Sequence, residues 1–463
     1  MKKNLLISLF LLNASFIAGA QNETNHWFFG TYAYLDFSGG APVVGMGPLT
    51  TTEGTASMSD AAGNLMFYTN GVDVWDSTHT IMSNGSGLMG DVSTTQSAIV
   101  VPSPVTNTQY YIFTIDDIGG PNGFRYSIVD MTLNSGLGNV TAAKNVALTD
   151  SVAEKISVTR GLGGDNYWIV VHKWGTNQFY AYHLTTAGLQ PPVITSVGTV
   201  HSTSTFQNTY GQMKFNMCGD RLALALGYMD LVELYDFNQN NGVVSNPVSL
   251  NLGDNVYGVE FSPSGDLLYA TCYDPNVTIA QYNITLANAP LILASKVPLS
   301  LTPDLYALQL APDGKIYVSR SFTSSYLGVI ASPDTPGAGC GYNDNGIDLD
   351  PGFNGVNGAL GLPAFVQSFF GTGDSCTNFL GVKENVVQVL TIFPNPSSDE
   401  FTLDLSGIGK PADVAVYNAT GKLVEKHTRV SSVLRFGRSL SNGIYAVAVI
   451  SENKVDTYLI IKE

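Results

Sequence analysis

The sequence predicts an all-β protein, a seven-bladed β-propeller followed by a small C-terminal β-sandwich. One observation is a repeated strand–turn–strand unit, clearest in residues 256–270 and 305–318, where an apolar run meets a Gly-containing turn and a second apolar run. Another is the spacing of this unit, which recurs seven times at intervals of roughly 40–55 residues, as propeller blades do. The third is a shift near residue 389 to denser charge and shorter strands.

The seven units align on one position near the start of the first strand of each. These positions are Ala56, Ala98, Ile156, Gly211, Gly258, Ala307 and Ala364. The last unit, residues 363–369, lacks a second strand, whereas the alternating run 27–37 precedes the first unit. We therefore expect residues 27–37 to complete the seventh blade, because closing the ring removes the sheet edges of an open array. Two stacked sandwiches of short strands are the alternative.

The N-terminus has the features of an export signal. Two lysines precede an apolar run over residues 5–17, and residues 18–20 form an A-x-A cleavage site. We expect the signal peptide, residues 1–20, to be cleaved after Ala20. A membrane anchor is the alternative, but the run is short, and no later stretch approaches the ~20 apolar residues that span a bilayer. The sequence thus predicts a secreted or outer-surface protein that passes through the periplasm and has no transmembrane segment.

Composition argues against one class of partner. The chain has 463 residues and a formal net charge of −16, and only 13% of its residues are charged. Nucleic-acid binding needs a basic face, so we expect no nucleic-acid partner.

Four cysteines in an exported chain permit disulfides. Cys340 and Cys376 flank the last blade, and we predict that they pair and staple its C-terminal end. Cys218 follows an inner strand and Cys272 ends a second strand, so we expect them at different heights on the blades and leave them unpaired. A disulfide across such a loop contributes roughly 3–4 kcal/mol.

The mature chain divides into three predicted segments: the propeller over residues 21–371, a linker over 372–388 that begins rich in Gly, Ser, Thr and Asn, and a C-terminal domain over 389–463. The last contains seven short strand candidates, which suggest an Ig-like antiparallel sandwich. They are residues 390–393, 401–405, 414–417, 422–426, 433–436, 443–450 and 457–461.

The C-terminal domain also carries a series of short motifs. They are Phe393-Pro394-Asn395-Pro396, Val416-Tyr417-Asn418 with Gly421-Lys422, Leu440 with Gly443-Ile444-Tyr445, and Ile460-Ile461-Lys462. In this order they resemble the type A C-terminal sorting domain of the type IX secretion system of Bacteroidota. The resemblance implies passage across the outer membrane by that machinery and removal of the tail by a surface sortase. Release or attachment to lipopolysaccharide would follow. An ordinary accessory sandwich is the alternative.

The predicted propeller carries a second resemblance. Residues 27–30, 35–37, 65–71, 95–100, 126–131 and 361–365 are similar to exported propellers of gliding and related Bacteroidota, within the YVTN/WD40-like group. This resemblance implies the fold but assigns no ligand.

Motifs for metal or covalent chemistry are weak or absent in the sequence. Asn343–Asp350 places several oxygen ligands beside a glycine, which suits calcium, but it does not follow the EF-hand pattern, and a polar turn is favoured. The chain has no H-E-x-x-H, no zinc-type Cys/His spacing and no G-x-S-x-G elbow. We therefore assign no catalytic residue, metal or cofactor, and keep a structural calcium near Asp344–Asp350 as a minor alternative.

One end of the central channel is the predicted ligand site. If the inner strands run in parallel around the axis, the residues just before the aligned positions form a ring, here called the rim. Tyrosines with a few polar groups suit sugars or peptides, and the alternative is that these tyrosines only pack between blades. The predicted ligand-binding residues are Tyr210, Tyr257, Tyr306, Gln96, Glu154 and Lys155.

These observations favour a secreted or cell-surface propeller that binds an extracellular glycan or protein, in adhesion or recognition, without chemistry. A lactonase- or lyase-like enzyme is one alternative, and it requires at least three titratable groups within about 5 Å of one another in the channel. A channel lined by Tyr, Ser, Ala and Met would favour binding. A structural scaffold of the cell surface is the other alternative.

Overall fold

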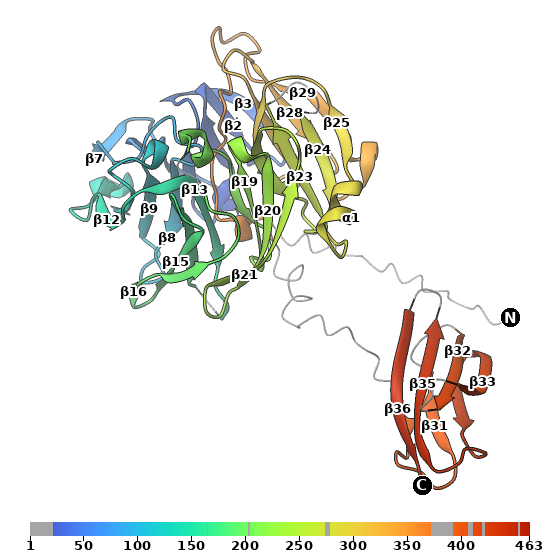
Figure 1. Cartoon of the computed structure of the whole chain (residues 1–463). Helices are drawn as coiled ribbons and strands as arrows, with labels where there is room; N and C mark the ends of the chain where they lie inside the picture. Colours follow the sequence, from blue (N-terminus) through green and yellow to red (C-terminus); the bar gives the residue numbers. More distant parts are fainter. Residues whose placement is uncertain are drawn as a thin grey trace, which may run out of the picture. The chain divides into compact units, whose positions relative to one another are not determined.

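The computed structural model describes residues 22–163, 165–201, 204–273, 278–371, 392–405, 411–418, 422–451 and 454–463. The chain forms two compact units, Met1–Asn378 and Phe379–Glu463, drawn in Figure 1. The boundary between them falls within the predicted linker. The predicted signal peptide and its cleavage site lie outside the described residues.

The first unit is built of β-meanders arranged around a common centre, as Figure 1 shows. A three-stranded sheet contains β1 (His26–Phe29), β2 (Thr31–Asp36) and β3 (Val43–Thr50). A nine-stranded sheet contains β4 (Ala56–Ser59), β5 (Leu65–Thr69), β6 (Asp73–Asp76), β7 (Ile81–Ser86), β8 (Ala98–Pro102), β9 (Gln109–Ile115), β10 (Phe124–Asp130), β11 (Asn139–Val140) and β12 (Val146–Thr149). It consists of two meanders that are joined by a single parallel pairing of Ser83 with Asn139.

Four further sheets follow in chain order. They contain β13 (Val152–Arg160), β14 (Tyr167–Lys173), β15 (Gln178–Thr185), β16 (Gly188–Leu189) and β17 (Val193–Ser196); β18 (Met213–Phe215), β19 (Arg221–Leu226), β20 (Leu231–Asn238) and β21 (Val243–Asn251); β22 (Val256–Phe261), β23 (Leu267–Cys272), β24 (Ile279–Asn283) and β25 (Val297–Ser300); and β26 (Leu305–Leu310), β27 (Ile316–Arg320), β28 (Tyr326–Ile330) and β29 (Tyr342–Asp348). The all-β prediction is confirmed.

Helices are short in the described part of the chain. Asn288 caps the α-helix α1 (Ala289–Ala294) by accepting a hydrogen bond from the backbone of Leu291 at 3.1 Å. No helix in the described ranges is both long and apolar enough to cross a membrane. The 3₁₀ helices are η1 (Asn22–Thr24), η2 (Asp117–Gly119), η3 (Asn134–Gly136), η4 (Phe206–Thr209), η5 (Gly227–Met229), η6 (Gly337–Cys340) and η7 (Gln367–Phe369).

Local turn chemistry produces the repeated hairpins. The β22–β23 and β26–β27 hairpins turn at Gly265 and Gly314, whose φ angles are 76° and 75°. Glycine adopts this left-handed region without the steric cost that a Cβ imposes. The two units from which the fold was predicted therefore form the expected strand pairs.

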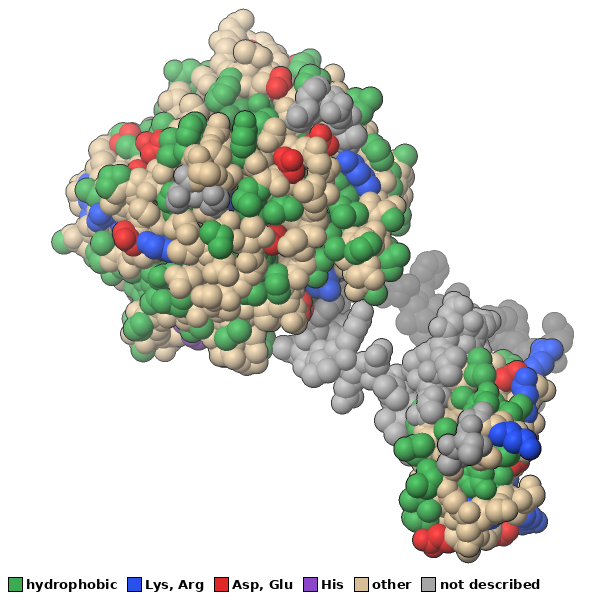
Figure 2. All heavy atoms as spheres, viewed as in Figure 1, with side chains coloured by type: hydrophobic (Ala, Val, Ile, Leu, Met, Phe, Trp, Pro, Cys, Tyr) green, Lys and Arg blue, Asp and Glu red, His purple; other side chains and the backbone are tan. Residues whose placement is uncertain are grey.

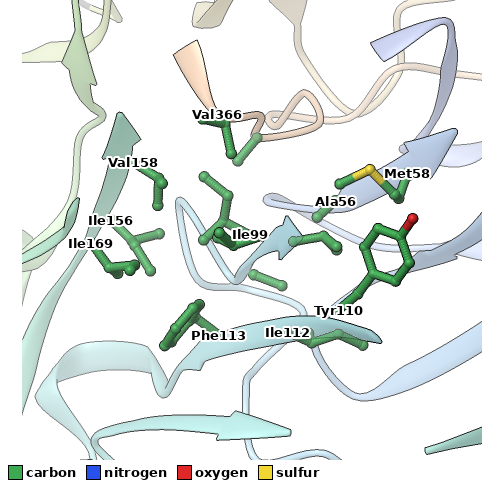
Figure 3. Close-up of a cluster of buried hydrophobic side chains, with 14 of the residues drawn as sticks. Ala56, Met58, Ile99, Tyr110, Ile112, Phe113, Ile156, Val158, Ile169 and Val366 are labelled. Carbon is green, nitrogen blue, oxygen red and sulfur yellow. The ribbon is translucent and has the colours of Figure 1, made fainter. Parts of the chain in front are cut away.

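The chain ends of the first unit meet differently from the prediction. Residues 363–369 form no strand: Pro363 makes one isolated bridge with Thr55, and η7 follows. Proline has no N–H to donate to a ladder. The segment instead closes the unit by packing, because the rings of Trp27 and Phe365 lie 5.8 Å apart. Figure 3 shows Val366 near Ile99, among side chains from β4, β8 and β13.

The second unit contains two sheets that share one hydrophobic core, in which Phe401, Val414 and Val447 are buried. All seven predicted strands occur. The first sheet contains β30 (Ile392–Phe393), β31 (Phe401–Asp404) and β34 (Val433–Phe436), and the second β33 (Leu423–Val430), β32 (Ala412–Asn418), β35 (Gly443–Ser451) and β36 (Lys454–Lys462).

The predicted disulfide between Cys340 and Cys376 is wrong. Cys340 is a free thiol at the end of η6, where it is fully buried in the hydrophobic core beside β26–β28, and burial raises the pKa of its thiol. Cys376 lies outside the described residues. Cys218, which was expected to be unpaired, is in a disulfide. Chain position alone suggested the pairing of Cys340, but its side chain faces the core.

Candidate functional site

The predicted rim residues all lie where the inner strands begin, but most are inaccessible. Gln96, Glu154, Lys155 and Tyr257 are buried, with at most 3% of their surface exposed. Tyr210, which follows η4, and Tyr306, in β26, are half-buried.

Gln96 ties two sheets together. Its Oε1 accepts hydrogen bonds from the backbone N–H groups of Met213 at 2.8 Å and Ile156 at 3.3 Å. Its Nε2 donates to the carbonyl of Met213 at 3.2 Å. The amide is thus committed to backbone groups of β13 and β18, which indicates a structural role.

The carboxylate of Glu154 is saturated by protein donors. It accepts hydrogen bonds from the N–H and hydroxyl of Thr95 at 3.0 and 3.1 Å, from the N–H of Ile118 at 3.0 Å and from the hydroxyl of Thr209 at 2.8 Å. Burial raises the pKa of its carboxyl against the opposing effect of these donors. Glu154 therefore anchors the loops that surround it.

The ammonium group of Lys155 lies near Glu154 and donates hydrogen bonds to backbone carbonyls. Its Nζ donates to the carbonyl of Thr209 at 2.5 Å and to that of Tyr210. Burial lowers the pKa of this ammonium to about 7, although the nearby Glu154 raises it. Lys155 thereby fastens the end of η4 to β13.

Tyr257 packs inside the protein, beside a carboxylate that the prediction did not assign to the site. Its ring meets that of Tyr306 edge-on at 5.3 Å, and only 2% of Tyr257 is exposed. Its hydroxyl and Oε2 of Glu53 are both buried without a hydrogen-bond partner. Burial, followed by the charge of Glu154, raises the pKa of Glu53 well above its ordinary value. For Tyr257 the structure therefore matches the alternative of packing between blades.

Two groups of carboxylates bear on metal binding. Asp91, Asp116 and Asp117 each offer an oxygen, and these oxygens lie within 4.8 Å of one another, a separation that suits oxygen ligands at 2.3–2.6 Å from Ca²⁺. In the stretch considered for calcium, Asp344 instead accepts hydroxyl donors from Ser300, Thr302 and Tyr342. That carboxylate already serves the packing of β29.

The opposite end of the same inner strands carries a pocket of about 510 Å³, here called the hairpin-end pocket. It lies where the β4–β5, β8–β9 and β13–β14 hairpins turn. Its lining residues are Glu23, Ser59, Asp60, Ala61, Met66, Pro102, Ser103, Pro104, Val105, Thr106, Asn107, Tyr110, Arg160, Asp165, Tyr167 and Phe369. The rim was predicted from the residues that precede the inner strands. The turns that follow these strands also gather at one end of a ring, and they are the sequence signal for this pocket.

The hairpin-end pocket combines aromatic rings with hydroxyl groups. Ser59 Oγ is buried and has no hydrogen-bond partner. The guanidinium of Arg160 lies over the ring of Phe369, with Cζ 5.3 Å from the ring centroid. Burial raises the pKa values of the Tyr110 and Tyr167 phenols, so both hydroxyls stay protonated and able to donate.

The walls of this pocket are held by hydrogen bonds outside it. The backbone of Arg160 donates to Ser368 Oγ at 3.0 Å and accepts from Gln239 Nε2 at 2.8 Å. The carboxylate of Asp60 accepts from the N–H groups of Ala62 and Asn64, each at 2.9 Å. These bonds fix the hairpin turns that form the lining.

Comparison with known proteins identifies the second unit. Residues 391–463 match the family described as secretion system C-terminal sorting domain. The tail is a secretion sorting domain. The type IX resemblance that the sequence predicted is confirmed, and it implies secretion to the cell surface.

Motif residues of the sorting domain make hydrogen bonds between its strands and the adjoining segments. Asn395, between Pro394 and Pro396, donates to the carbonyl of Leu459 at 2.9 Å and accepts from the N–H of Ile461 at 2.9 Å, joining the start of the domain to β36. The Tyr445 hydroxyl donates to the carbonyl of Ser441 at 2.7 Å, beside Gly443 at the start of β35. Gly421 lies outside the described residues.

The solved structures that align with this chain are distant from it in sequence. The β-propeller domain of Cps50 (Swd1) from Myceliophteria thermophila aligns with a TM-score of 0.39 and 10% identity, covering 64% of this chain and 94% of that chain. Periplasmic gluconolactonase PpgL of Pseudomonas aeruginosa has a TM-score of 0.37 and 12% identity, covering 79% and 94%. Hsv2 of Kluyveromyces lactis has 0.36 and 11%, covering 66% and 90%. The comparison with curated proteins finds no match.

Proposed function

We propose that this protein is a seven-bladed propeller that the type IX secretion system displays or releases at the outer cell surface, where it recognises an extracellular glycan or protein without chemistry. Taken as two blades, the two meanders of the nine-stranded sheet would bring the number of blades to seven. Residues 363–366 would be the inner segment of the blade formed by β1–β3. The two sheets of the tail would form the predicted sandwich. Export would include cleavage after Ala20 and removal of the sorting domain by a sortase.

The observation that carries the binding proposal is the hairpin-end pocket. Ligand sites are typically concave, about 300–1,000 Å³ in volume, and mostly apolar with a few convergent polar groups. A pocket of about 510 Å³ falls in this range of volumes, and it combines three aromatic residues with an unpartnered serine and one arginine. Basic side chains are few and scattered on the face shown in Figure 2. On that face, attraction between opposite charges therefore does not favour one class of partner.

The test of this proposal combines a glycan array with a pull-down from envelope and medium fractions, using the purified protein. Binding of a defined glycan or protein, together with no turnover of lactones or glycosides, is expected. Mass spectrometry of the same fractions should find the mature chain outside the cell with its tail removed. Turnover without any binding partner would reverse the assignment.

An enzyme of the lactonase or lyase kind is the second candidate. It is favoured by the three carboxylate oxygens of Asp91, Asp116 and Asp117, which lie within 4.8 Å of one another beside the rim. This separation fits the distance of about 5 Å that such an enzyme requires. A divalent ion there would polarise a carbonyl. Turnover that Ca²⁺ restores after chelation, and that Asp117→Asn abolishes, would establish this candidate.

A further inference from the structure

We propose that the hairpin-end pocket binds an uncharged carbohydrate residue. This inference rests on the proposed function and adds to it a ligand class and a place, at the opposite end of the inner strands from the rim that the sequence predicted.

The first step is an unsatisfied hydroxyl in the pocket wall. Only 1% of Ser59 is exposed, and its Oγ has no hydrogen-bond partner. Leaving a buried polar group unpaired costs free energy, because the group loses its hydrogen bonds to water. The hydroxyl of Tyr110 also makes no hydrogen bond within the described residues. A ligand that carries adjacent hydroxyls would supply a partner to the Tyr110 hydroxyl directly, and to Ser59 Oγ once the atoms that cover it shift, because hydroxyls donate and accept at once.

The second step is the apolar part of the lining. Tyr110, Tyr167 and Phe369 contribute rings, and Met66 and two prolines add aliphatic surface. A sugar ring presents C–H groups on its faces and hydroxyls at its edge, so it matches a wall of aromatic rings that carry polar groups. A purely apolar ligand would leave the serine and phenol hydroxyls unpaired, at the cost given above.

The third step is charge. Three carboxylates, those of Glu23, Asp60 and Asp165, line the pocket with one cation, Arg160. A phosphate or an acidic sugar would meet this excess of negative charge. The same excess would attract a cationic ligand, but Arg160 lies in the same pocket, and both oxygens of Asp60 already accept hydrogen bonds from its own turn. An uncharged polyhydroxylated ligand avoids both conflicts.

The test uses the purified full-length mature protein on an array of neutral, anionic and amino-sugar glycans, with calorimetry on the strongest neutral glycan. Ser59→Ala and Tyr110→Phe each remove only a hydroxyl, and we expect each to weaken binding about two- to tenfold, the size of one neutral hydrogen bond. Tyr306→Phe at the rim is the matched control and should leave affinity unchanged. Unfolding curves of the three variants check that the fold is retained.

The possible outcomes distinguish failure of this inference from failure of the proposed function on which it rests. Neutral-glycan binding that falls with Ser59→Ala and Tyr110→Phe, but not with Tyr306→Phe, supports it. Binding that depends only on Tyr306, or binding of anionic or amino sugars alone, overturns it and leaves a glycan-binding propeller. A protein partner in the pull-down with no glycan on the array also overturns it while the proposed function stands. No partner of either kind overturns both.

Discussion

Lys214 and Glu260 form an ion pair deep inside the first unit, and removing the lysine charge should strongly destabilise that unit. Nζ of Lys214 lies 3.3 Å from Oε2 of Glu260, and the two side chains are 3% and 2% exposed. Gln309 accepts a second hydrogen bond from Lys214, and Gln367 donates to Glu260 at 2.9 Å. The pair thus joins β18, β22 and β26 to η7, which closes the unit.

The expected magnitude follows from burial. Lys214→Met keeps the length of the side chain but leaves Glu260 as an uncompensated buried charge, and breaking such a pair typically costs about 3–5 kcal/mol. The remaining donors, which are the N–H groups of Phe261 and Leu310, each at 3.1 Å, and the Gln367 amide, soften this cost but supply no positive charge. Lys315→Met is the control, because Lys315 pairs with Asp313 at 3.0 Å near the surface, where ion pairs contribute about 0–1 kcal/mol.

The loss should also depend on pH. Burial raises the pKa of Glu260 in the folded protein even with Lys214 present. A carboxyl whose folded pKa exceeds the unfolded value, about 4.3, binds more protons when folded, so stability falls as pH rises above that value. Without Lys214 the pKa of Glu260 rises further. Lys214→Met should therefore lose more stability than the wild type as the pH rises above about 4.3.

Urea unfolding followed by tryptophan fluorescence measures this effect, because all four tryptophans, at positions 27, 75, 168 and 174, belong to the first unit. The double variant Lys214→Met/Glu260→Gln should lose less than the sum of the two single variants, since it leaves no unpaired charge. A loss below about 1 kcal/mol for Lys214→Met, or a loss that does not change with pH, would refute the reasoning.

Three further predictions concern single positions and the tail. Tyr257→Ala should lower the free energy of unfolding by about 3–5 kcal/mol, because it empties a buried aromatic site. Tyr257→Phe removes only an unpartnered hydroxyl and should change the free energy of unfolding by less than about 1 kcal/mol. Equal losses in the two variants would contradict the assignment of Tyr257 as a packing residue. Cys340→Ser should leave non-reducing electrophoretic mobility unchanged, while Cys218→Ser should alter it, and the reverse pattern would place the disulfide elsewhere. Removing residues 391–463 should leave the tryptophan unfolding transition intact but retain the protein in the periplasm, and finding that truncated protein in the medium would overturn the role of the tail.

Several features of this protein follow from short stretches of sequence. The hairpin turns at Gly265 and Gly314 need a residue that tolerates positive φ, and glycine marks them directly. In the sorting domain, the motifs that contain Asn395 and Tyr445 are contiguous in the sequence, so they can be recognised in the linear chain, although Asn395 bonds to Leu459, 64 residues further on. Strand order within each meander follows as well, because consecutive strands pair through short connections.

The candidate site did not follow in the same way. Glu154 and Lys155 have the residue types of a ligand site, but the fold commits both to neighbouring loops. Gln96 bonds to Met213, 117 residues further along the chain. No local sequence pattern predicts such a hydrogen-bond partner, because the pairing depends on how sheets from distant parts of the chain pack together.

The amino-acid sequence by itself determined the repeated hairpins, the all-β class and the sorting tail, since each depends on residues that lie close together in the chain. Only the tertiary structure decided which polar groups are used up in packing and which, like Ser59 in the hairpin-end pocket, are left without a partner. The physical reason is that burial and hydrogen-bond satisfaction are properties of contacts across the whole unit, whereas strand and turn preferences belong to the residue and its neighbours in the chain.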